Sequence, residues 1–139
     1  MEETRQGDAR AVRRDRILII EDNAYVREAF EVTLKRTALK ALVVSTAEEA
    51  LQAVQQHTFD IIICDNRLPG MDGIEFFTQA EHHTRGAVKV LTSAYGFDSL
   101  ETESGPIPVD HFVLKPFSIH QLLLNLSNGP PYTTGGEST

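Results

Sequence analysis

Cysteine, long apolar runs and positive charge are all scarce in this sequence, and each scarcity excludes a class of protein. Cys64 is the only cysteine among 139 residues, so no disulfide can form within the chain and a reducing compartment is expected. No stretch approaches the roughly 20 apolar residues of a membrane-spanning helix, and no apolar run near the N-terminus has the pattern of a signal peptide. These absences favour a cytoplasmic protein that makes no contact with a membrane.

Positive charge is outweighed by negative charge. The chain has 13 Lys and Arg residues against 20 Asp and Glu residues, which leaves a formal net charge of -7. A broad nucleic-acid-binding surface needs clustered basic side chains, and the one basic cluster, residues 10–16, contains Asp15 and precedes the first expected strand. We therefore expect no direct binding to nucleic acid, and we interpret residues 1–15 as a flexible N-terminal extension.

Short apolar runs alternate regularly with amphipathic segments along the rest of the chain. With 41% hydrophobic residues the sequence suits a single domain, which we expect at residues 16–127. The apolar runs are rich in branched residues, which predicts strands at residues 17–20, 41–44, 60–64, 87–91 and 111–114. Helical spacing predicts helices at residues 24–37, 46–54, 74–83 and 119–126. The alternation predicts an α/β fold: a doubly wound, flavodoxin-like sheet of five parallel strands in the order 2-1-3-4-5, with helices on both faces.

Two stretches depart from this pattern. Residues 96–108, before the fifth strand, have one central apolar anchor, Leu100, together with Pro106 and Pro108, which disfavour helical geometry. We expect the fourth helical position to hold a helix of at most two turns or a mobile segment. Residues 128–139 are polar and rich in Gly, Pro, Thr and Ser, so we expect a flexible C-terminal tail or a linker to a further domain.

Polar side chains collect where the predicted strands end. Because the carboxyl ends of parallel strands meet at one edge of the sheet, we expect these polar side chains to share a site. They are Glu21 and Asp22 after the first strand, Asp65 after the third, Thr92 and Ser93 after the fourth, and Lys115 after the fifth. Three carboxylates in one cleft repel one another unless a cation is bound, and Mg²⁺ prefers such oxygen ligands. The pattern predicts a magnesium site beside a lysine.

The same groups suit the transfer of a phosphoryl group. A carboxylate can serve as the nucleophile, while a metal ion and a lysine stabilise the charge on the phosphoryl oxygens. Little else is required, because phosphoryl transfer depends mainly on positioning and electrostatics. We therefore expect an aspartate that accepts phosphate.

The motifs that carry these residues resemble those of a known family. They are Glu21-Asp22-Asn23, Asp65 followed by Leu-Pro-Gly-Met-Asp-Gly at residues 68–73, Ser93-Ala94, and Lys115-Pro116-Phe117. In this order, at successive strand ends, they resemble the receiver domain of bacterial two-component response regulators, of the chemotaxis-regulator type, over residues 16–127. The resemblance implies a phosphorylation-dependent signalling switch that is not an enzyme, apart from autocatalytic phosphoryl transfer and slow self-dephosphorylation.

The resemblance also implies a role for each residue of the site. Asp65 would accept the phosphoryl group from a sensor histidine kinase or a phosphotransfer protein. Glu21, Asp22, Asp65 and the backbone carbonyl of Arg67 would hold Mg²⁺. Lys115 would contact the phosphoryl group, and the peptide bond that follows it is usually cis in this family.

A switch is implied on the neighbouring strands. Ser93 would move toward the phosphoryl group and draw in Phe112, so that the face from strand four to the last helix changes its binding to a downstream protein or to an output domain outside this chain. Thr92 competes with Ser93 for this role. The family pattern places a small residue directly after the hydroxyl, and Ala94 favours Ser93.

Three alternatives use a similar sheet differently. A nucleotide-binding domain would carry glycines after its first strand, where Glu21-Asp22-Asn23 stands. An aspartyl phosphatase typically needs a second aspartate two positions after the nucleophile as a general acid, and that position holds Arg67. The third alternative, a degenerate receiver that acts as a phosphorylation-independent protein interaction module, remains open, although all residues of the acceptor site are present.

The remaining polar residues receive more ordinary interpretations. Cys64 should be a small buried side chain that points away from the acceptor, and Asp72 should belong to a turn whose backbone shape Gly73 permits. The five histidines lack the spacing of metal ligands. Arg67 and Tyr95 are expected to overhang the site, at positions where the family tunes the lifetime of the phosphate.

Overall fold

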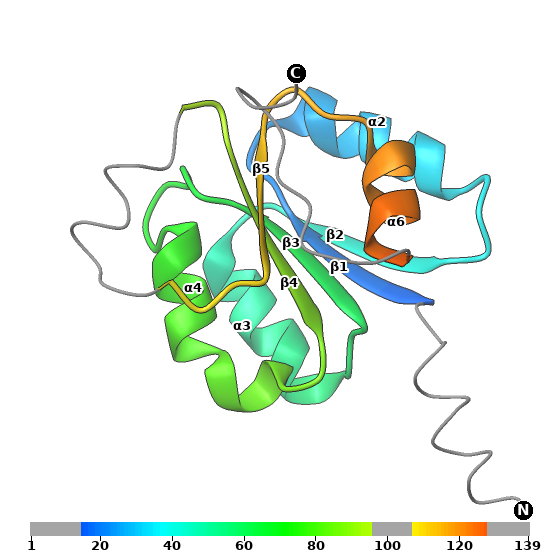
Figure 1. Ribbon diagram of the computed structural model, residues 1–139. Helices are drawn as coiled ribbons and strands as arrows, with labels where there is room; N and C mark the ends of the chain where they lie inside the picture. Colours follow the sequence, from blue (N-terminus) through cyan, green and yellow to red (C-terminus); the bar gives the residue numbers. More distant parts are fainter. Residues whose placement is uncertain (1–14, 96–106, 128–139) are drawn as a thin grey trace, which may run out of the picture.

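The computed structural model describes residues 15–95 and 107–127, which form a sheet covered by helices on both faces (Figure 1). Three expectations fall on segments outside the described residues: the N-terminal extension, the helix or mobile segment at the fourth helical position, and the C-terminal tail or linker. Over the described ranges, no helix combines the length and the apolar character that crossing a bilayer demands.

Five parallel strands make up the sheet, and their order is the predicted one. They are β1 (Arg16–Ile20), β2 (Lys40–Val44), β3 (Ile61–Asp65), β4 (Val88–Ser93) and β5 (His111–Leu114), arranged β2-β1-β3-β4-β5. The register pairs Ile20 of β1 with both Val44 of β2 and Cys64 of β3. The carboxyl ends of β1 and β3 therefore lie side by side near the middle of one edge of the sheet.

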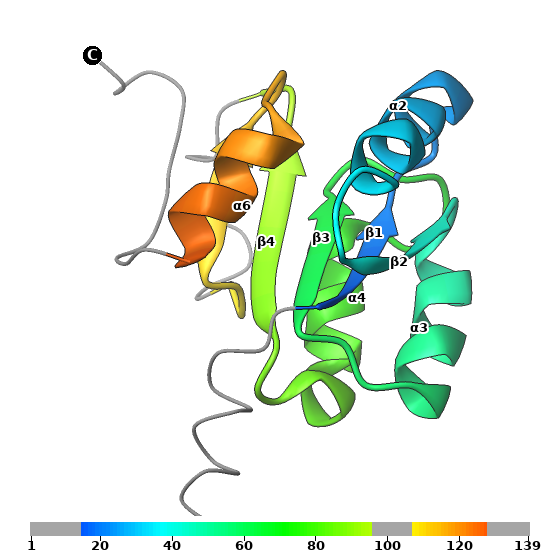
Figure 2. The same ribbon diagram turned by 90° about the vertical axis from the view of Figure 1, so that its right-hand side faces the viewer.

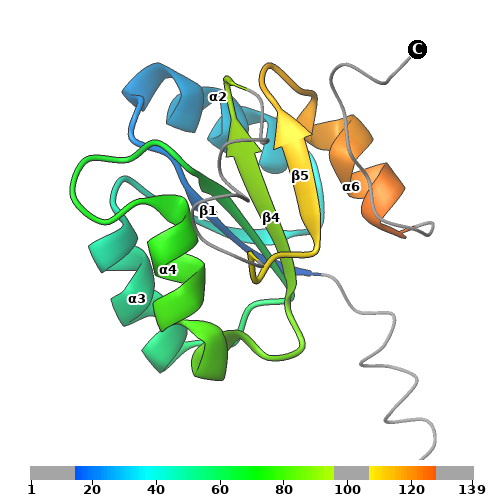
Figure 3. The same cartoon turned by 60° about the vertical axis from the view of Figure 1, so that its left-hand side comes forward.

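Within residues 15–95 and 107–127, two α-helices cover each face of the sheet. The helices α2 (Ala24–Leu34) and α6 (Ile119–Ser127) lie against one face, and α3 (Ala47–Gln56) and α4 (Gly73–Gln79) lie against the other (Figures 1 and 3). Figure 2 looks onto the face that α2 and α6 cover. Helices lie on the faces because each parallel strand must be joined to the next by a crossover connection.

The bounds of two helices differ from those that apolar spacing predicts. The helix α2 ends at Leu34 and not at residue 37, because Thr37 donates both its backbone N–H and its hydroxyl to the carbonyl of Leu34 and so tightens the last turn. The segment predicted as one helix over residues 74–83 is α4 followed by a 3-10 turn, η1 (Glu81–Thr84). The hydroxyl of Thr84 donates to the carbonyl of Ala80 at 2.9 Å and stabilises that turn.

The branched side chains of β1 contribute to two separate apolar layers. Leu18 and Ile20 pack toward α3 and α4, Ile17 and Ile19 pack toward α2 and α6, and all four are at most 1% exposed. Burying each such side chain stabilises the fold by about 1.5–3 kcal/mol. Because both faces of the sheet are apolar, the polar side chains of this region lie at the ends of the strands.

Candidate functional site

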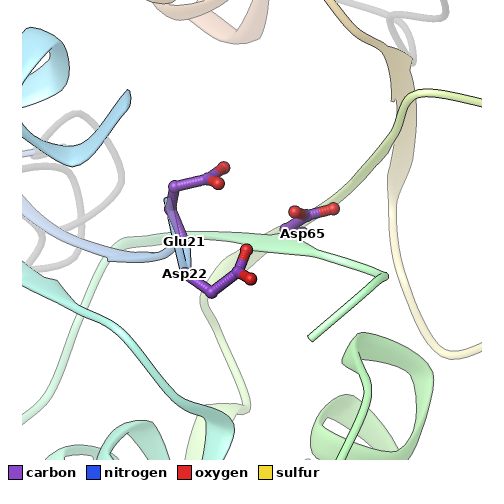
Figure 4. Close-up of side chains that lie close together, drawn as sticks. All are labelled: Glu21, Asp22 and Asp65. Carbon is purple, nitrogen blue, oxygen red and sulfur yellow. The ribbon is translucent and has the colours of Figure 1, made fainter. Parts of the chain in front are cut away.

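Three carboxylates meet where β1 and β3 end. Glu21 and Asp22 follow β1 directly and Asp65 is the last residue of β3, so the pairing of the two strands brings the three side chains together (Figure 4). One carboxylate oxygen from each residue lies within 4.8 Å of those of the other two. Glu21 and Asp65 are only 2% and 6% exposed, whereas Asp22 faces solvent.

A lysine that follows β5 bridges two of these carboxylates. Nζ of Lys115 lies 3.1 Å from Oε1 of Glu21 and 3.2 Å from Oδ2 of Asp65, and the Lys115–Pro116 peptide is cis, as expected. Burial lowers the pKa of the Lys115 ammonium, but the negative charges of Asp65 and Glu21 outweigh burial, so the pKa lies above its ordinary value. The ammonium is therefore charged at neutral pH and offsets part of the repulsion within the cluster.

The two carboxylate oxygens of Asp65 have different donors. Oδ2 accepts from the ammonium of Lys115, while Oδ1 accepts from the backbone N–H of Arg67 at 3.3 Å. The next residue, Asn66, donates its N–H to the carbonyl of Thr92 at 2.8 Å and continues the pairing of β3 with β4 beyond the last strand residue. The backbone at Asp65 is therefore fixed by the pairing of β3 with β4 and by the hydrogen bond of the next residue.

The start of α4 lies unusually close to this backbone. A Cβ added at Gly73 would lie 2.8 Å from the carbonyl oxygen of Asp65 and 2.9 Å from Cα of Asn66. We expected Gly73 to permit the shape of a turn, but positive φ angles occur at Gly70 and Gly86 instead, so the requirement at Gly73 is steric. Asp72 precedes α4 and also caps it, because its Oδ1 accepts a hydrogen bond from the N–H of Glu75.

Two hydroxyl-bearing residues end β4 beside the carboxylates. Thr92 is the register partner of Asp65, Ser93 is the next residue, and both are at most 3% exposed. Oγ of Ser93 accepts from the N–H of Tyr95 at 3.0 Å, and the carbonyl of Ser93 accepts from the N–H of Lys115 at 2.8 Å. Ser93 is therefore tied to the lysine through the backbone, and its role as the switch stays a prediction.

Arg67 and Tyr95 stack on each other. The guanidinium carbon of Arg67 lies 4.8 Å from the centroid of the Tyr95 ring, and the tyrosine is 62% exposed. Both follow strand ends of the site, which is why each was expected to overhang it. Their mutual contact was not predicted, since the motifs treat the two positions separately.

Several candidates lie in the core or outside the cluster. Phe112 is half-buried on β5 and packs against the apolar layer of α3 and α4. Cys64 is fully buried in the same layer, and burial first, then the charge of Asp65, raise the pKa of its thiol well above the ordinary value. Among residues 15–95 and 107–127, the acidic cluster is the one group with the arrangement of metal ligands, and no histidine belongs to it.

Two residues that no motif singled out contact the loops of the site. Nη1 of Arg27 donates to the backbone carbonyls of Glu21 at 3.0 Å and of Asp22 at 2.9 Å. Oε2 of Glu48 accepts from the N–H of Met71 at 3.3 Å. Charged residues on amphipathic helices ordinarily face solvent, so helical spacing alone gives no reason to select them. The available signal for Arg27 is its place in the first turns of α2, where side chains lean back toward the preceding loop.

Comparison with known proteins identifies the family. The model of the response regulator receiver domain matches residues 17–127. The chain belongs to this family. Over 110 residues the receiver is 28% identical to the transcriptional regulatory protein SrrA of Staphylococcus aureus, and the match covers 79% of this chain and 45% of SrrA. The chain therefore spans about half the length of this relative.

Solved receiver structures share the fold. A CheY-like receiver domain protein from Methanospirillum hungatei gives a TM-score of 0.73 at 24% identity, covering 81% of this receiver and 90% of that chain. The response regulator TrrA from Thermotoga maritima, whose structure is a complex with Mg²⁺-BeF, gives a TM-score of 0.69 at 24% identity, covering 81% and 96%. At these identities the likeness establishes the fold.

Receiver domains are phosphoacceptor modules of two-component signalling that interact with histidine kinases, and they are not enzymes. The acidic cluster of this receiver is of the type that holds Mg²⁺ in the family. Its donor set fits that ion, because carboxylate oxygens are hard ligands and the exposed Asp22 leaves room for the waters that Mg²⁺ retains.

Proposed function

We propose that this receiver accepts a phosphoryl group on Asp65 from a histidine kinase or a phosphotransfer protein and thereby changes its binding to a partner. The position of Asp65 carries the proposal. Its carboxylate is nearly buried at a strand end, 3.2 Å from an ammonium and in one cluster with two further carboxylates. An ordinary strand-end carboxylate that caps a turn would require neither the lysine nor the other acids.

In the proposed reaction an oxygen of Asp65 attacks the phosphorus of a phosphohistidine. The O–P bond forms as the P–N bond breaks, and the electron pair of the broken bond stays on the histidine nitrogen. Lys115 is placed to neutralise charge on the transferred oxygens, because its Nζ already lies beside Oδ2 of Asp65. Mg²⁺, held by Glu21, Asp22, Asp65 and the carbonyl of Arg67, would supply further positive charge at the same oxygens.

The change of state would pass from Ser93 to Phe112. Ser93 is nearly buried at the end of β4, and Phe112 is half-buried on the adjacent strand β5. Movement of the Ser93 hydroxyl toward the phosphoryl group would let the ring of Phe112 turn further inward. The face from β4 to α6 would then present a different surface to a downstream protein or to an output domain outside this chain.

An apolar groove beside the site suits the docking of a protein phosphodonor. The groove has a volume of about 350 Å³ and runs between α2 and the loop after β5, lined by Tyr25, Val26, Ala29, Phe30, Lys115, Pro116 and Phe117. Tyr25 is 83% exposed, and aromatic residues are enriched where proteins bind each other. Since Lys115 borders both the groove and the acidic cluster, a protein bound there would lie next to Asp65.

The proposed receiver unit comprises residues 16–127, with residues 1–15 as an extension and residues 128–139 as a tail or linker. The family match over residues 17–127 supports this division. A cytoplasmic location goes with phosphorylation by a histidine kinase, and the free, buried thiol of Cys64 is compatible with a reducing compartment.

Incubation with Mg²⁺ and acetyl phosphate, followed by intact mass measurement, tests the proposal. We expect the mass to rise by one phosphoryl group, and Asp65→Asn to abolish the gain. Asp72→Asn is the matched control, because Asp72 is an exposed carboxylate at the start of α4 and should leave the gain intact. If the folded wild-type protein gains no mass, the degenerate receiver that acts as a phosphorylation-independent interaction module becomes the better explanation.

A further inference from the structure

We infer that Arg27 is a positioning residue for the metal site: its guanidinium holds the backbone of Glu21 and Asp22 so that the Asp22 carboxylate lies in the acidic cluster. Nη1 of Arg27 donates to the two successive carbonyls, at 3.0 Å and 2.9 Å. The inference rests on the proposed binding of Mg²⁺. It states that Arg27, which is not itself a metal ligand, affects the affinity for the ion.

The loop between β1 and α2 needs such a contact. Oδ1 of Asn23 caps the helix by accepting from the N–H groups of Tyr25 and Val26, at 2.9 Å and 3.1 Å. This cap fixes the first turn of α2 but does not touch the carbonyls of the two residues before it. The side chain of Arg27 reaches back from the helix and binds those carbonyls instead.

The three carboxylates are held in different ways. Those of Glu21 and Asp65 each accept a hydrogen bond from Lys115 and a second one from a backbone N–H of the loop that follows. Within the described residues, no hydrogen bond reaches the carboxylate of Asp22. The direction of that carboxylate therefore depends on its own backbone. Two contacts hold the Asp22–Asn23 peptide: the N–H of Asn23 donates to Oε2 of Glu21, and Arg27 donates to the carbonyl of Asp22. Of these, the contact from Arg27 comes from outside the proposed ligand set.

Burial makes the hydrogen bond from Arg27 to the carbonyl of Glu21 difficult to replace by water, whereas the bond to the carbonyl of Asp22 is exposed. Glu21 is 2% exposed, and its carbonyl lies in the part-buried environment that Arg27 shares. A buried carbonyl without a donor is unfavourable, so loss of the guanidinium would turn this peptide unit toward solvent. The Asp22 carboxylate would move with it, because the two residues are adjacent.

Titration calorimetry with MgCl₂, well below the unfolding temperature, tests the inference on the full chain. Arg27→Met removes the donors but keeps an unbranched stem, and we expect it to weaken Mg²⁺ binding about tenfold, as is usual for groups that orient metal ligands. Arg36→Met removes the same charge from an exposed arginine beyond the far end of α2 and should bind Mg²⁺ like the wild type. Arg27→Lys should restore part of the affinity, because an ammonium can still donate to a carbonyl.

Acetyl phosphate kinetics give a second readout. Arg27→Met should raise the Mg²⁺ concentration that gives half the maximal phosphorylation rate, with the maximal rate itself nearly unchanged. Equal Mg²⁺ affinity for folded Arg27→Met and Arg36→Met overturns the inference and leaves the proposed function standing. Failure of the wild type to bind Mg²⁺ overturns the proposed metal site itself. If circular dichroism finds Arg27→Met unfolded, Arg27→Lys decides: weaker binding than wild type supports the inference, and equal binding contradicts it.

Discussion

The two loops that carry the acidic cluster are fixed by different means. In the first loop, residues 21–23, the N–H of Glu21 continues the pairing with β2, and side chains hold the rest: Asn23 caps α2, and Arg27 binds two carbonyls. The second loop, residues 66–72, is bound by the side chains of Glu48 and Asp65, and in addition it is held by close packing of the backbone. There the start of α4 packs directly on Asp65 and Asn66, and Gly73 donates its N–H to the carbonyl of Asn66 at 3.1 Å.

This difference distinguishes Asp22 from Asp65, the proposed phosphate acceptor. A loop held by side chains can lose one hydrogen bond at a time, and its arginine or asparagine can be shortened without a clash. A loop held by close backbone packing tolerates no added atom. The first loop carries the exposed Asp22 and the second follows the buried Asp65, so we expect the position of Asp22 to be open to gradual change, while Asp65 is tied to the core.

The largest effect is expected from an added methyl group at Gly73. Its Cβ would approach the carbonyl oxygen of Asp65 to 2.8 Å and Cα of Asn66 to 2.9 Å, and backbone atoms cannot rotate away as a side chain can. We expect Gly73→Ala to lower the free energy of unfolding by about 3 kcal/mol. It should also slow phosphorylation of Asp65. Urea denaturation and intact mass measurement check the two effects.

Gly86→Ala is the control for this variant. Gly86 has a φ of +88° and no atom within 4 Å of an added Cβ, so its penalty is that of the left-handed backbone alone, about 1–2 kcal/mol. Phosphorylation of Asp65 should be unaffected. Equal losses of stability in the two variants, with equal phosphorylation, would contradict the steric explanation for Gly73.

The next effect concerns Lys115, which joins the two loops by binding Glu21 after β1 and Asp65 at the end of β3. Lys115→Met leaves two nearly buried carboxylates without their shared cation and should lower the free energy of unfolding by about 1–3 kcal/mol at neutral pH. Added Mg²⁺ should recover part of the loss, since it relieves the same repulsion. Urea denaturation with and without MgCl₂ measures both; an unchanged stability would mean that the bridge is energetically neutral.

The pH dependence separates the charge of Lys115 from the packing of its stem. Because the pKa of Lys115 is raised on folding, the folded state holds this proton more tightly than the unfolded chain. Its contribution is therefore fully present below the ordinary lysine pKa of 10.5 and is lost as the pH rises through the folded-state pKa. The difference in unfolding free energy between wild type and Lys115→Met should be constant from neutral pH up to the ordinary lysine pKa and should shrink above the folded-state pKa. A difference that persists in alkali would assign the effect to packing.

A smaller effect is expected where the two loops are alike, at the helix caps. Oδ1 of Asn23 accepts from two N–H groups of α2, and Oδ1 of Asp72 accepts from the N–H of Glu75 at 2.8 Å. Asn23→Ala and Asp72→Ala should each cost about 1 kcal/mol in urea denaturation. Asn23→Ser keeps a capping oxygen and should recover most of the loss. A cost confined to one loop would mean that the caps are not equivalent.

The sheet and the acidic cluster could be predicted because both follow from strand ends. Apolar runs fix where strands lie, parallel order fixes which ends meet, and Glu21, Asp22, Asp65 and Lys115 then share an edge whatever the loops do. The end of α2 could not be predicted in this way. Apolar spacing says nothing about Thr37, whose hydroxyl and N–H bind the last carbonyl.

The two features that distinguish the loops also escaped prediction. The sequence does not distinguish a glycine that is required for a positive φ from one that is required for close approach of the backbone. The expectation for Gly73 was therefore the shape of a turn. The contact of Arg27 depends on the conformation of a long side chain, which a sequence pattern does not fix. Motifs identify the groups that perform the chemistry, while the groups that hold them are determined by packing.

The smallest effect is expected from the stack of Arg67 and Tyr95, because a cation–π contact at an exposed site contributes about 0.5–1 kcal/mol. Arg67 belongs to the second loop, and the first loop has no such pair within the described residues. Arg67→Ala and Tyr95→Ala should each change the decay rate of phosphorylated Asp65. Intact mass, followed over time after removal of acetyl phosphate, gives these rates.

The double variant decides whether the stack acts as a unit. If each side chain is oriented by the other, the second substitution adds nothing once the contact is lost, and the rates should depart from additivity by roughly two- to fivefold, the equivalent of the cation–π energy. Tyr95→Phe keeps the ring and should preserve the coupling to Arg67. Strictly additive rates would mean that the two side chains reach the phosphate independently. Unchanged rates in all variants would mean that neither side chain affects the lifetime of the phosphate.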